Sequence, residues 1–136
     1  MSGADDWLER ARSDLEMVRR AMLEPPDPAQ AAYHLQQSAE KAVKALLAHL
    51  GIRYPRTGGK GHDIRLAAAL VPDDHRFRAE AAALADLTPW ATVFRYPTDD
   101  PTLAPALPSP ADVEAWRSKL KKFIENVSVE IGQKGQ

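Results

Sequence analysis

Residues 36–47 of the chain are Gln36-Gln37-Ser38-Ala39-Glu40-Lys41-Ala42-Val43-Lys44-Ala45-Leu46-Leu47. Apolar side chains recur in and around this stretch at three- and four-residue steps, which is the period of an α-helix. These apolar positions are Leu35, Ala39, Ala42, Val43, Leu46 and Leu50. At roughly 100° per residue, Gln37, Glu40, Lys41 and Lys44 fall on the opposite side. The stretch therefore predicts an amphipathic helix with a buried stripe and a solvated face, on which Glu40 and Lys44 form an exposed ion pair.

Length and composition indicate one soluble domain. The chain has 136 residues, a formal charge of −1 and no cysteine, so we expect a single hydrophobic core without disulfides or thiolate metal sites. We place the domain at residues 4–131 and a frayed tail at 132–136. The near-neutral charge predicts no global attraction to nucleic acid or to an anionic membrane. No apolar run approaches the ~18–20 residues of a membrane span, and the first residues do not resemble a signal peptide. We therefore expect a cytoplasmic protein.

Apolar periodicity and helix breakers predict five helices in all, the second of which contains residues 36–47. The first should cover residues 4–23, before Glu24-Pro25-Pro26. The second should begin at the Asp27-Pro28 cap and end before Gly51, which suits a left-handed C-terminal position. A short third helix is expected over 64–71, with Leu66 and Leu70 inward, and a fourth over 74–94 that is kinked or split at Pro89.

Residues 96–110 contain five prolines: Pro97, Pro101, Pro105, Pro108 and Pro110. Such a long connection without regular structure suggests a functional or interaction segment. Ser109 then caps the last helix, with Asp112 at the capping-box position. Its predicted inner stripe is Val113, Trp116, Leu120, Phe123, Val127 and Ile131. No stretch alternates as a half-buried strand does, so we predict an all-α, up-and-down bundle of four to five helices.

Few residues carry a recognisable chemistry. The histidines His34, His49, His62 and His75 lack the spacing of a zinc hydrolase, and we expect neither a metal nor a cofactor. His34 and His49 should meet solvent. His62 stands close to Lys60 in a glycine-rich, basic segment, where it is either a cap or loop residue or part of an anion site.

Arg95 follows an apolar helical stripe and should approach the interior or the edge of a cleft. There its fork of donors would bind phosphate or carboxylate, or it would pair with an acid such as Glu40 or Asp86.

Four segments, taken in order, resemble the HEPN domain, which is named for higher-eukaryotic and prokaryotic nucleotide binding. The first is Trp7 with Ala11, Asp14 and Leu15. The second is the run from Tyr33 to Leu47, with the pattern aromatic-His-x-Gln-Gln-x-x-Glu-Lys-x-x-Lys-x-Leu-Leu. Gly-His-Asp-Ile at His62 and Phe-Arg-Tyr-Pro at residues 94–97 complete the set. The resemblance spans the chain from Trp7 to about Val127.

The resemblance implies a helical bundle that forms a homodimer and accompanies a minimal nucleotidyltransferase, as in toxin–antitoxin or stress-defence pairs. Many HEPN proteins are metal-independent ribonucleases with an Arg followed, after four to six residues, by His. Here positions 100, 101 and 102 hold Asp100, Pro101 and Thr102, so the sequence is similar to members that have Arg-Tyr-Pro and lack this histidine. The residues that match the family's motif positions are Gln37, Glu40, Lys41, Lys44, His62, Arg95 and Tyr96.

We therefore predict a non-catalytic module that binds a nucleotide or an RNA phosphate through Lys41, Lys44, His62, Arg95 and Tyr96, supported by Gln37 and Glu40. Arg95 and the lysines would contact phosphate, and Tyr96 would stack on a base or orient Arg95. Two alternatives stay open. One is an endoribonuclease in which His62 or another histidine replaces the missing one, and the other is a structural module whose 96–110 segment meets a partner.

Overall fold

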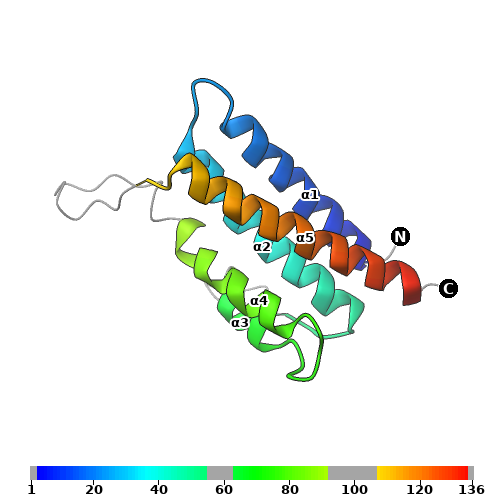
Figure 1. Cartoon of the computed structure of the whole chain (residues 1–136). Helices are drawn as coiled ribbons and strands as arrows, with labels where there is room; N and C mark the ends of the chain where they lie inside the picture. The colour runs from blue at the N-terminus through cyan, green and yellow to red at the C-terminus, as the bar shows by residue number, and fades with distance from the viewer. Residues whose placement is uncertain (1–2, 55–62, 92–106, 135–136) are drawn as a thin grey trace.

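The computed structural model describes residues 3–54, 63–91 and 107–134, and these are mostly helical (Figure 1). The elements are α1 (Gly3–Ala21), α2 (Pro28–His49), α3 (Ile64–Ala69), α4 (Arg78–Leu84), the 3₁₀ helix η2 (Ala85–Ala91) and α5 (Pro110–Lys134). The described residues contain no strand. The prediction of an all-α, up-and-down bundle is thereby confirmed.

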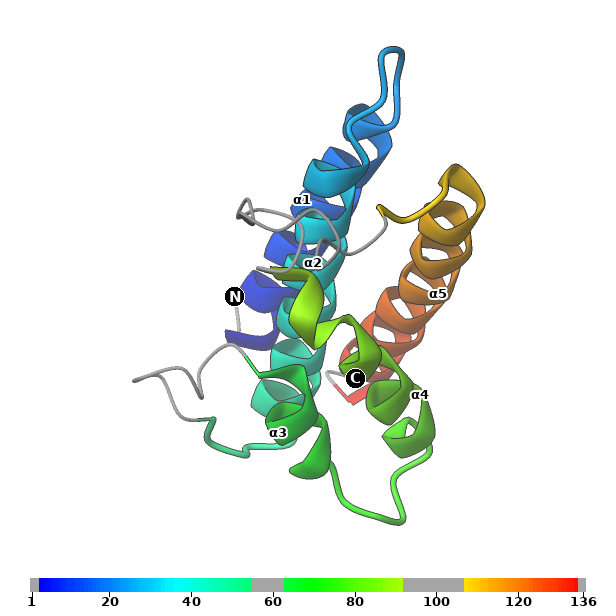
Figure 2. The same cartoon turned by 90° about the vertical axis from the view of Figure 1, so that its left-hand side faces the viewer.

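Helix α2 is the centre of the bundle. It contacts α1, α3, η2 and α5. Helix α1 lies antiparallel to α2 on one side, and α5 lies parallel to α2 on another (Figures 1 and 2). Helix α1 therefore begins at the end of the bundle where α5 finishes. The two long helices α1 and α2 are joined by a short connection in which Asp27 caps α2 by accepting a hydrogen bond from the Gln30 N–H at 3.2 Å.

This central position overturns the predicted solvated face of α2. Glu40 is only 2 % exposed, and Gln36 and Ser38 are fully buried. Ser38 Oγ donates to the Ala11 carbonyl oxygen at 2.7 Å, and Gln37 donates to the Gln36 side chain at 2.7 Å. Periodicity located the apolar stripe correctly, but a helix covered on several sides also buries polar positions, which must then find partners inside the protein. The predicted exposure of the Glu40–Lys44 pair was therefore wrong.

The ends of the long helices follow their local sequence signals. Gly51 has φ +73°, the left-handed conformation predicted for it after α2. At the start of α5, Ser109 Oγ accepts from the Asp112 N–H at 3.0 Å, and Asp112 accepts from the Ser109 N–H at 3.4 Å, which is the predicted capping box. Helix α5 continues to Lys134, beyond the Gly132 at which we expected fraying.

The region between α2 and α5 differs most from prediction. In α3 the inward residues are Ile64, Ala67 and Ala68, whereas Leu66 and Leu70 are exposed, so the predicted inner face was wrong. Only Arg65 is polar among the six residues of this helix, so the apolar period does not fix which side of it faces the core. Val71, just beyond α3, is also buried.

Helix α4 starts at Arg78 rather than at residue 74. His75 turns the chain before it, because the His75 N–H donates to the Pro72 carbonyl and the Arg78 N–H donates to the His75 carbonyl, both at 3.0 Å. The predicted split at Pro89 is confirmed as a change from α-helix to 3₁₀ helix at Ala85. Proline lacks the N–H that would bond the carbonyl four residues earlier, and that residue is Ala85.

Candidate functional site: a cleft between α1 and α2

A cleft of about 1000 Å³ opens beside the N-terminal half of α1 and the C-terminal end of α2. We call it the α1–α2 cleft. Its described lining comes from α1, from α2 and from residues 52–54 after Gly51. These residues are Gly3, Asp6, Trp7, Arg10, Lys44, Leu47, Ala48, Ile52, Arg53 and Tyr54. It thus combines an apolar floor, two aromatic rings, three cations and one acid, the mixture typical of small-ligand sites.

Lys44 lies between the two aromatic rings of the cleft. Its Nζ is 5.0 Å from the ring centroid of Trp7 and 5.0 Å from that of Tyr54, within the range of a cation–π contact. The nearly buried Glu40 carboxylate lies 3.9 Å from the same ammonium. The ammonium of Lys44 therefore contacts side chains from α1, from α2 and from the segment after α2. These contacts fix the positions of the two rings in the wall of the cleft.

Burial shifts the pKa of the Tyr54 phenol. Desolvation first, and then the negative charge of Glu40, raise the pKa of its phenol above the ordinary value. The hydroxyl donates to the Asp63 carbonyl at 2.9 Å, an interaction that connects the cleft to the start of α3. The ring is therefore held in its neutral form with its face available to Lys44.

Two guanidinium groups complete the cleft. Sequence reasoning did not select Arg10, and it considered Arg53 only as one charge of the glycine-rich, basic segment after α2. Arg10 and Arg53 are both exposed, and within the described part of the chain neither forms an ion pair with an acid. Arg10 also lies 5.8 Å from the Trp7 ring centroid. The signals that could have found them were the three-residue step from Trp7 to Arg10 and the position of Arg53 just after the α2 cap. Unlike Lys44, which lies beside Glu40, Arg10 and Arg53 have no acidic partner among the described residues.

The predicted site residues of α2 lie along the seam between α1 and α2. Lys41 Nζ is 2.5 Å from Asp14 Oδ2, and His34 Nδ1 is 3.0 Å from Asp14 Oδ1. Lys41 and Gln37 are not among the described residues that line the cleft. Of the two predicted lysines, the structure therefore brings Lys44 into the cleft and pairs Lys41 with an acid of α1. His34 is mostly buried, so its predicted solvent exposure was wrong.

His62, Arg95 and Tyr96 lie outside the described residues, and so do Phe94 and Pro97. The predicted pairing of Arg95 with Glu40 or Asp86 therefore also lies outside the described residues. The predicted convergence of Arg95 with Lys41 and Lys44 stays a prediction.

A second polar cluster ties the C-terminal half of α5 to the rest of the bundle. Glu130 Oε2 lies 3.1 Å from His75 Nε2 and 3.5 Å from His49 Nε2, and Glu130 Oε1 accepts from Arg76. His49 is thus largely covered beside Glu130 of α5, with 9 % of its side chain exposed, contrary to the predicted exposure. Among the described residues no group of three or more histidines and acids is arranged to hold a metal ion. With Arg76 on the second carboxylate oxygen, this cluster serves as a structural tie.

The bundle and its polar central helix define a class of small all-α domain, and comparison with known proteins identifies the family. The family model of the HEPN domain matches residues 4–130. The chain therefore belongs to the HEPN domain family, as the resemblance of its motifs indicated. This membership supports a nucleotide- or RNA-related module.

A solved structure is similar over nearly its whole length. The crystal structure of TT1696 from Thermus thermophilus matches with a TM-score of 0.70 and 28 % sequence identity, covering 94 % of this chain and 98 % of that one. No curated protein matches the chain. In the described ranges, none of the helices combines the length and the apolar character needed to cross a bilayer.

Proposed function

We propose that the protein binds a nucleotide or an RNA phosphate in the α1–α2 cleft, without cleaving it. The observation that carries this proposal is the pairing of two guanidinium groups that lack a described acid partner, Arg10 and Arg53, with the rings of Trp7 and Tyr54 in one cleft of about 1000 Å³. Arginine presents several N–H donors in a geometry that suits phosphate oxygens. Aromatic faces bind nucleobases by stacking.

In this proposal Arg10 and Arg53 contact phosphate. Lys44 acts less as a direct phosphate ligand than as the charge that orients both rings, because its ammonium already faces Trp7, Tyr54 and Glu40. Arg95, Tyr96 and His62 keep the roles predicted from the family motif. Lys41 stabilises the seam beside the cleft through Asp14.

Isothermal titration with ADP, with ATP and with a short RNA tests the proposal. Wild-type protein should release or absorb heat with at least one of them at an affinity of about 100 μM or tighter. The double variant Arg10→Ala, Arg53→Ala should lose at least about a hundredfold in affinity, since two charge-assisted contacts would be removed, each contributing about 1.5–3 kcal/mol.

The matched control is Arg65→Ala, which removes an exposed arginine from α3, outside the cleft lining. It should bind as the wild type does. Equal affinity of the double variant and the control would exclude this cleft as the site. Absence of heat with all three ligands would exclude ligand binding itself.

We further propose that the protein acts as a homodimer beside a minimal nucleotidyltransferase in a toxin–antitoxin or stress-defence pair, in the cytoplasm. The support is family membership together with the sequence after Arg95, where no histidine stands at the ribonuclease spacing. Co-expression with such a nucleotidyltransferase, followed by size-exclusion chromatography with light scattering, should give a complex that contains two copies of this chain. Separate elution of a monomer would contradict both parts.

A further inference from the structure

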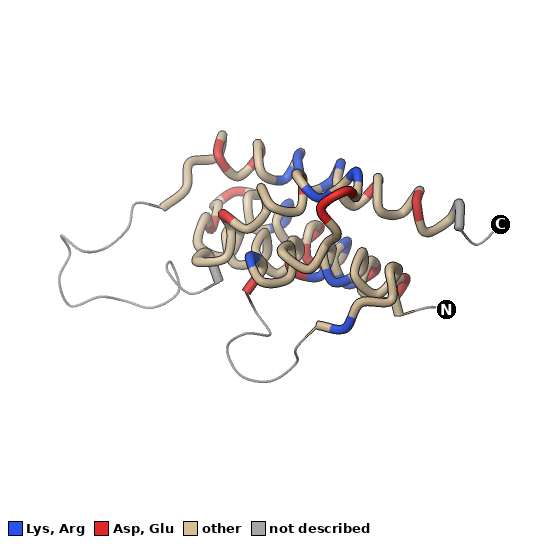
Figure 3. Tube along the Cα trace, turned by 90° about the horizontal axis from the view of Figure 1, so that it is seen from below, with Lys and Arg blue, Asp and Glu red and all other residues tan. Residues whose placement is uncertain are grey.

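The middle of helix α5 carries a charge of opposite sign to that of the chain as a whole. The formal charge of the protein is −1, yet between Glu114 and Glu125 this helix carries four cations and no acid: Arg117, Lys119, Lys121 and Lys122. Figure 3 marks these positions in blue on α5. A local excess of one sign creates a potential that the net charge does not reveal.

Three of these cations are exposed, and none of the three is in an ion pair with a described acid. Arg117 is already bound to Glu114, at 2.9 Å through both Nε and Nη2. Lys119, Lys121 and Lys122 are exposed, and the described residues provide none of them with an ion pair. At roughly 100° per residue, the three ammonium groups spread over the outer half of the helix. Lys121 is near enough to Glu114 for its charge to help lower the pKa of that carboxyl, after the larger effect of Arg117. No ammonium of the three is held in a close ion pair, so all three can contact an external anion.

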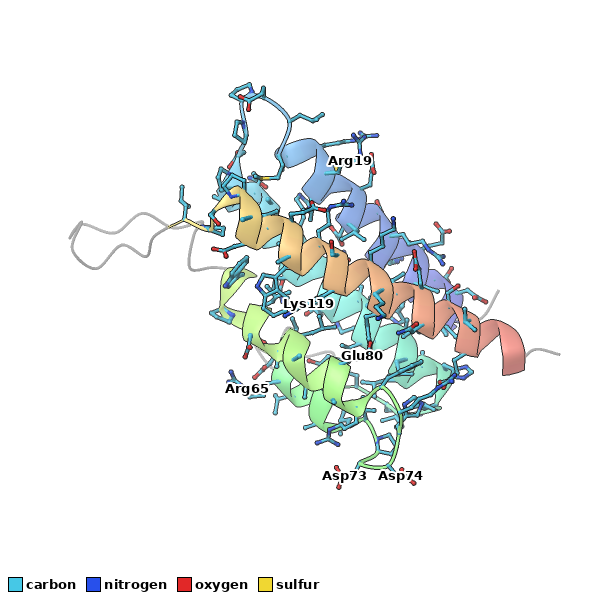
Figure 4. All side chains as sticks on the ribbon, viewed as in Figure 1. Arg19, Arg65, Asp73, Asp74, Glu80 and Lys119 are labelled. Atoms are coloured by element: carbon cyan, nitrogen blue, oxygen red, sulfur yellow. The ribbon has the colours of Figure 1, made fainter. Side chains whose placement is uncertain are left out.

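An aromatic platform lies beside the lysines. Lys119 Nζ is 4.9 Å from the Trp116 ring centroid, and Trp116 meets Trp90 of η2 edge to face with centroids 6.4 Å apart. Both indoles are half-buried. Figure 4 shows Lys119 on the side of α5 that faces α4. The Trp90–Trp116 contact fixes the indole in place, while Lys119 marks its accessible side.

We propose that Lys119, Lys121, Lys122 and Trp116, here called the α5 basic face, bind the phosphodiester backbone of a single-stranded nucleic acid. The lysines contact successive phosphates and Trp116 stacks on a base. Clustered lysines beside an aromatic ring are the combination that sequence-tolerant single-strand binding uses. An acidic protein partner fits less well, because lysine is depleted in the centre of protein–protein interfaces.

The α5 basic face is distinct from the α1–α2 cleft. The cleft opens beside Trp7 and Arg10, whereas the side of α1 that meets α5 carries Arg12, whose Nη2 donates to Ser128 Oγ at 3.0 Å. By helical periodicity Arg10 and Arg12 lie on different flanks of α1. The inference therefore goes beyond the proposed function and does not depend on it.

Fluorescence anisotropy with a labelled oligouridine of about 12 nucleotides tests the proposal on the full chain, titrated at several concentrations from about 50 to 200 mM KCl. Each single-strand phosphate contact contributes about −0.7 to the slope of log K against log salt. The double variant Lys121→Gln, Lys122→Gln should therefore flatten the slope by about 1.4 and weaken binding.

The matched control is Arg20→Gln, Arg65→Gln, which removes the same charge from two exposed positions on α1 and α3. It should leave the slope unchanged. An oligothymidine of equal length tests whether the α5 basic face distinguishes RNA from DNA. Binding of either strand with the expected slope supports the proposal. Equal slopes for both double variants, no binding by wild type, or tighter binding of polyglutamate would overturn it. The variant Arg10→Ala, Arg53→Ala should keep the slope, which separates this test from that of the cleft.

Discussion

At the scale of single residues, partners decide what a charged side chain can do. Lys41 and Lys44 stand three residues apart, yet Lys41 is paired with Asp14 and Lys44 lies between two rings beside Glu40. Arg10 and Arg53 have no acid partner in the described part of the chain. An anion entering the α1–α2 cleft would therefore meet the arginines without first breaking an ion pair.

Tyr54 should make stability sensitive to alkaline pH. Its pKa is raised above about 10 by burial and then by Glu40, so the folded state holds the phenolic proton more tightly than the unfolded state. This contribution is complete below the unfolded pKa and is lost as the pH rises through the folded pKa. As the pH rises above about 10, wild type should lose more unfolding free energy in urea than Tyr54→Phe.

Phenolate absorbance provides the direct check on Tyr54. The chain has three tyrosines, and a phenol transition displaced above the ordinary tyrosine value should disappear in Tyr54→Phe. Tyr33→Phe is the control and should retain it. If Tyr54→Phe titrates with the same displaced transition as wild type, the Tyr54 phenol is not shielded as the structure indicates.

At the scale of elements, caps and prolines set the helix ends. The reciprocal bonds of Ser109 and Asp112 begin α5 directly after a proline-containing segment. We expect Ser109→Ala to lower the free energy of unfolding by about 1 kcal/mol, the usual cost of removing an N-cap oxygen. Urea denaturation measures this loss. Ser13→Ala, an exposed serine inside α1, is the control and should be neutral or slightly stabilising. A neutral Ser109→Ala would mean that α5 begins without help from its cap.

At the scale of the whole molecule, Phe123 joins α5 to the segment before α4. It is 1 % exposed and meets Phe77 edge to face, with ring centroids 6.2 Å apart. Phe123→Ala should lower the free energy of unfolding by about 3–5 kcal/mol, because it opens a cavity that the bundle fills only in part. Val129→Ala, an exposed apolar position on the same helix, should change it by less than about 0.5 kcal/mol. Chemical denaturation compares the two, and similar losses would contradict the assigned core.

The sequence by itself determined the all-α class, the long helices α1, α2 and α5, the caps at Asp27 and Ser109, and the break at Pro89. These depend on interactions within a few residues, namely apolar period, capping oxygens and the missing proline N–H. Only the tertiary structure decided that α2 is covered on several sides, that Glu40 is buried, and that Arg10 and Arg53 share a cleft with Trp7 and Tyr54. Burial and ion pairing depend on which helices meet, and that information is spread over contacts distant in the chain.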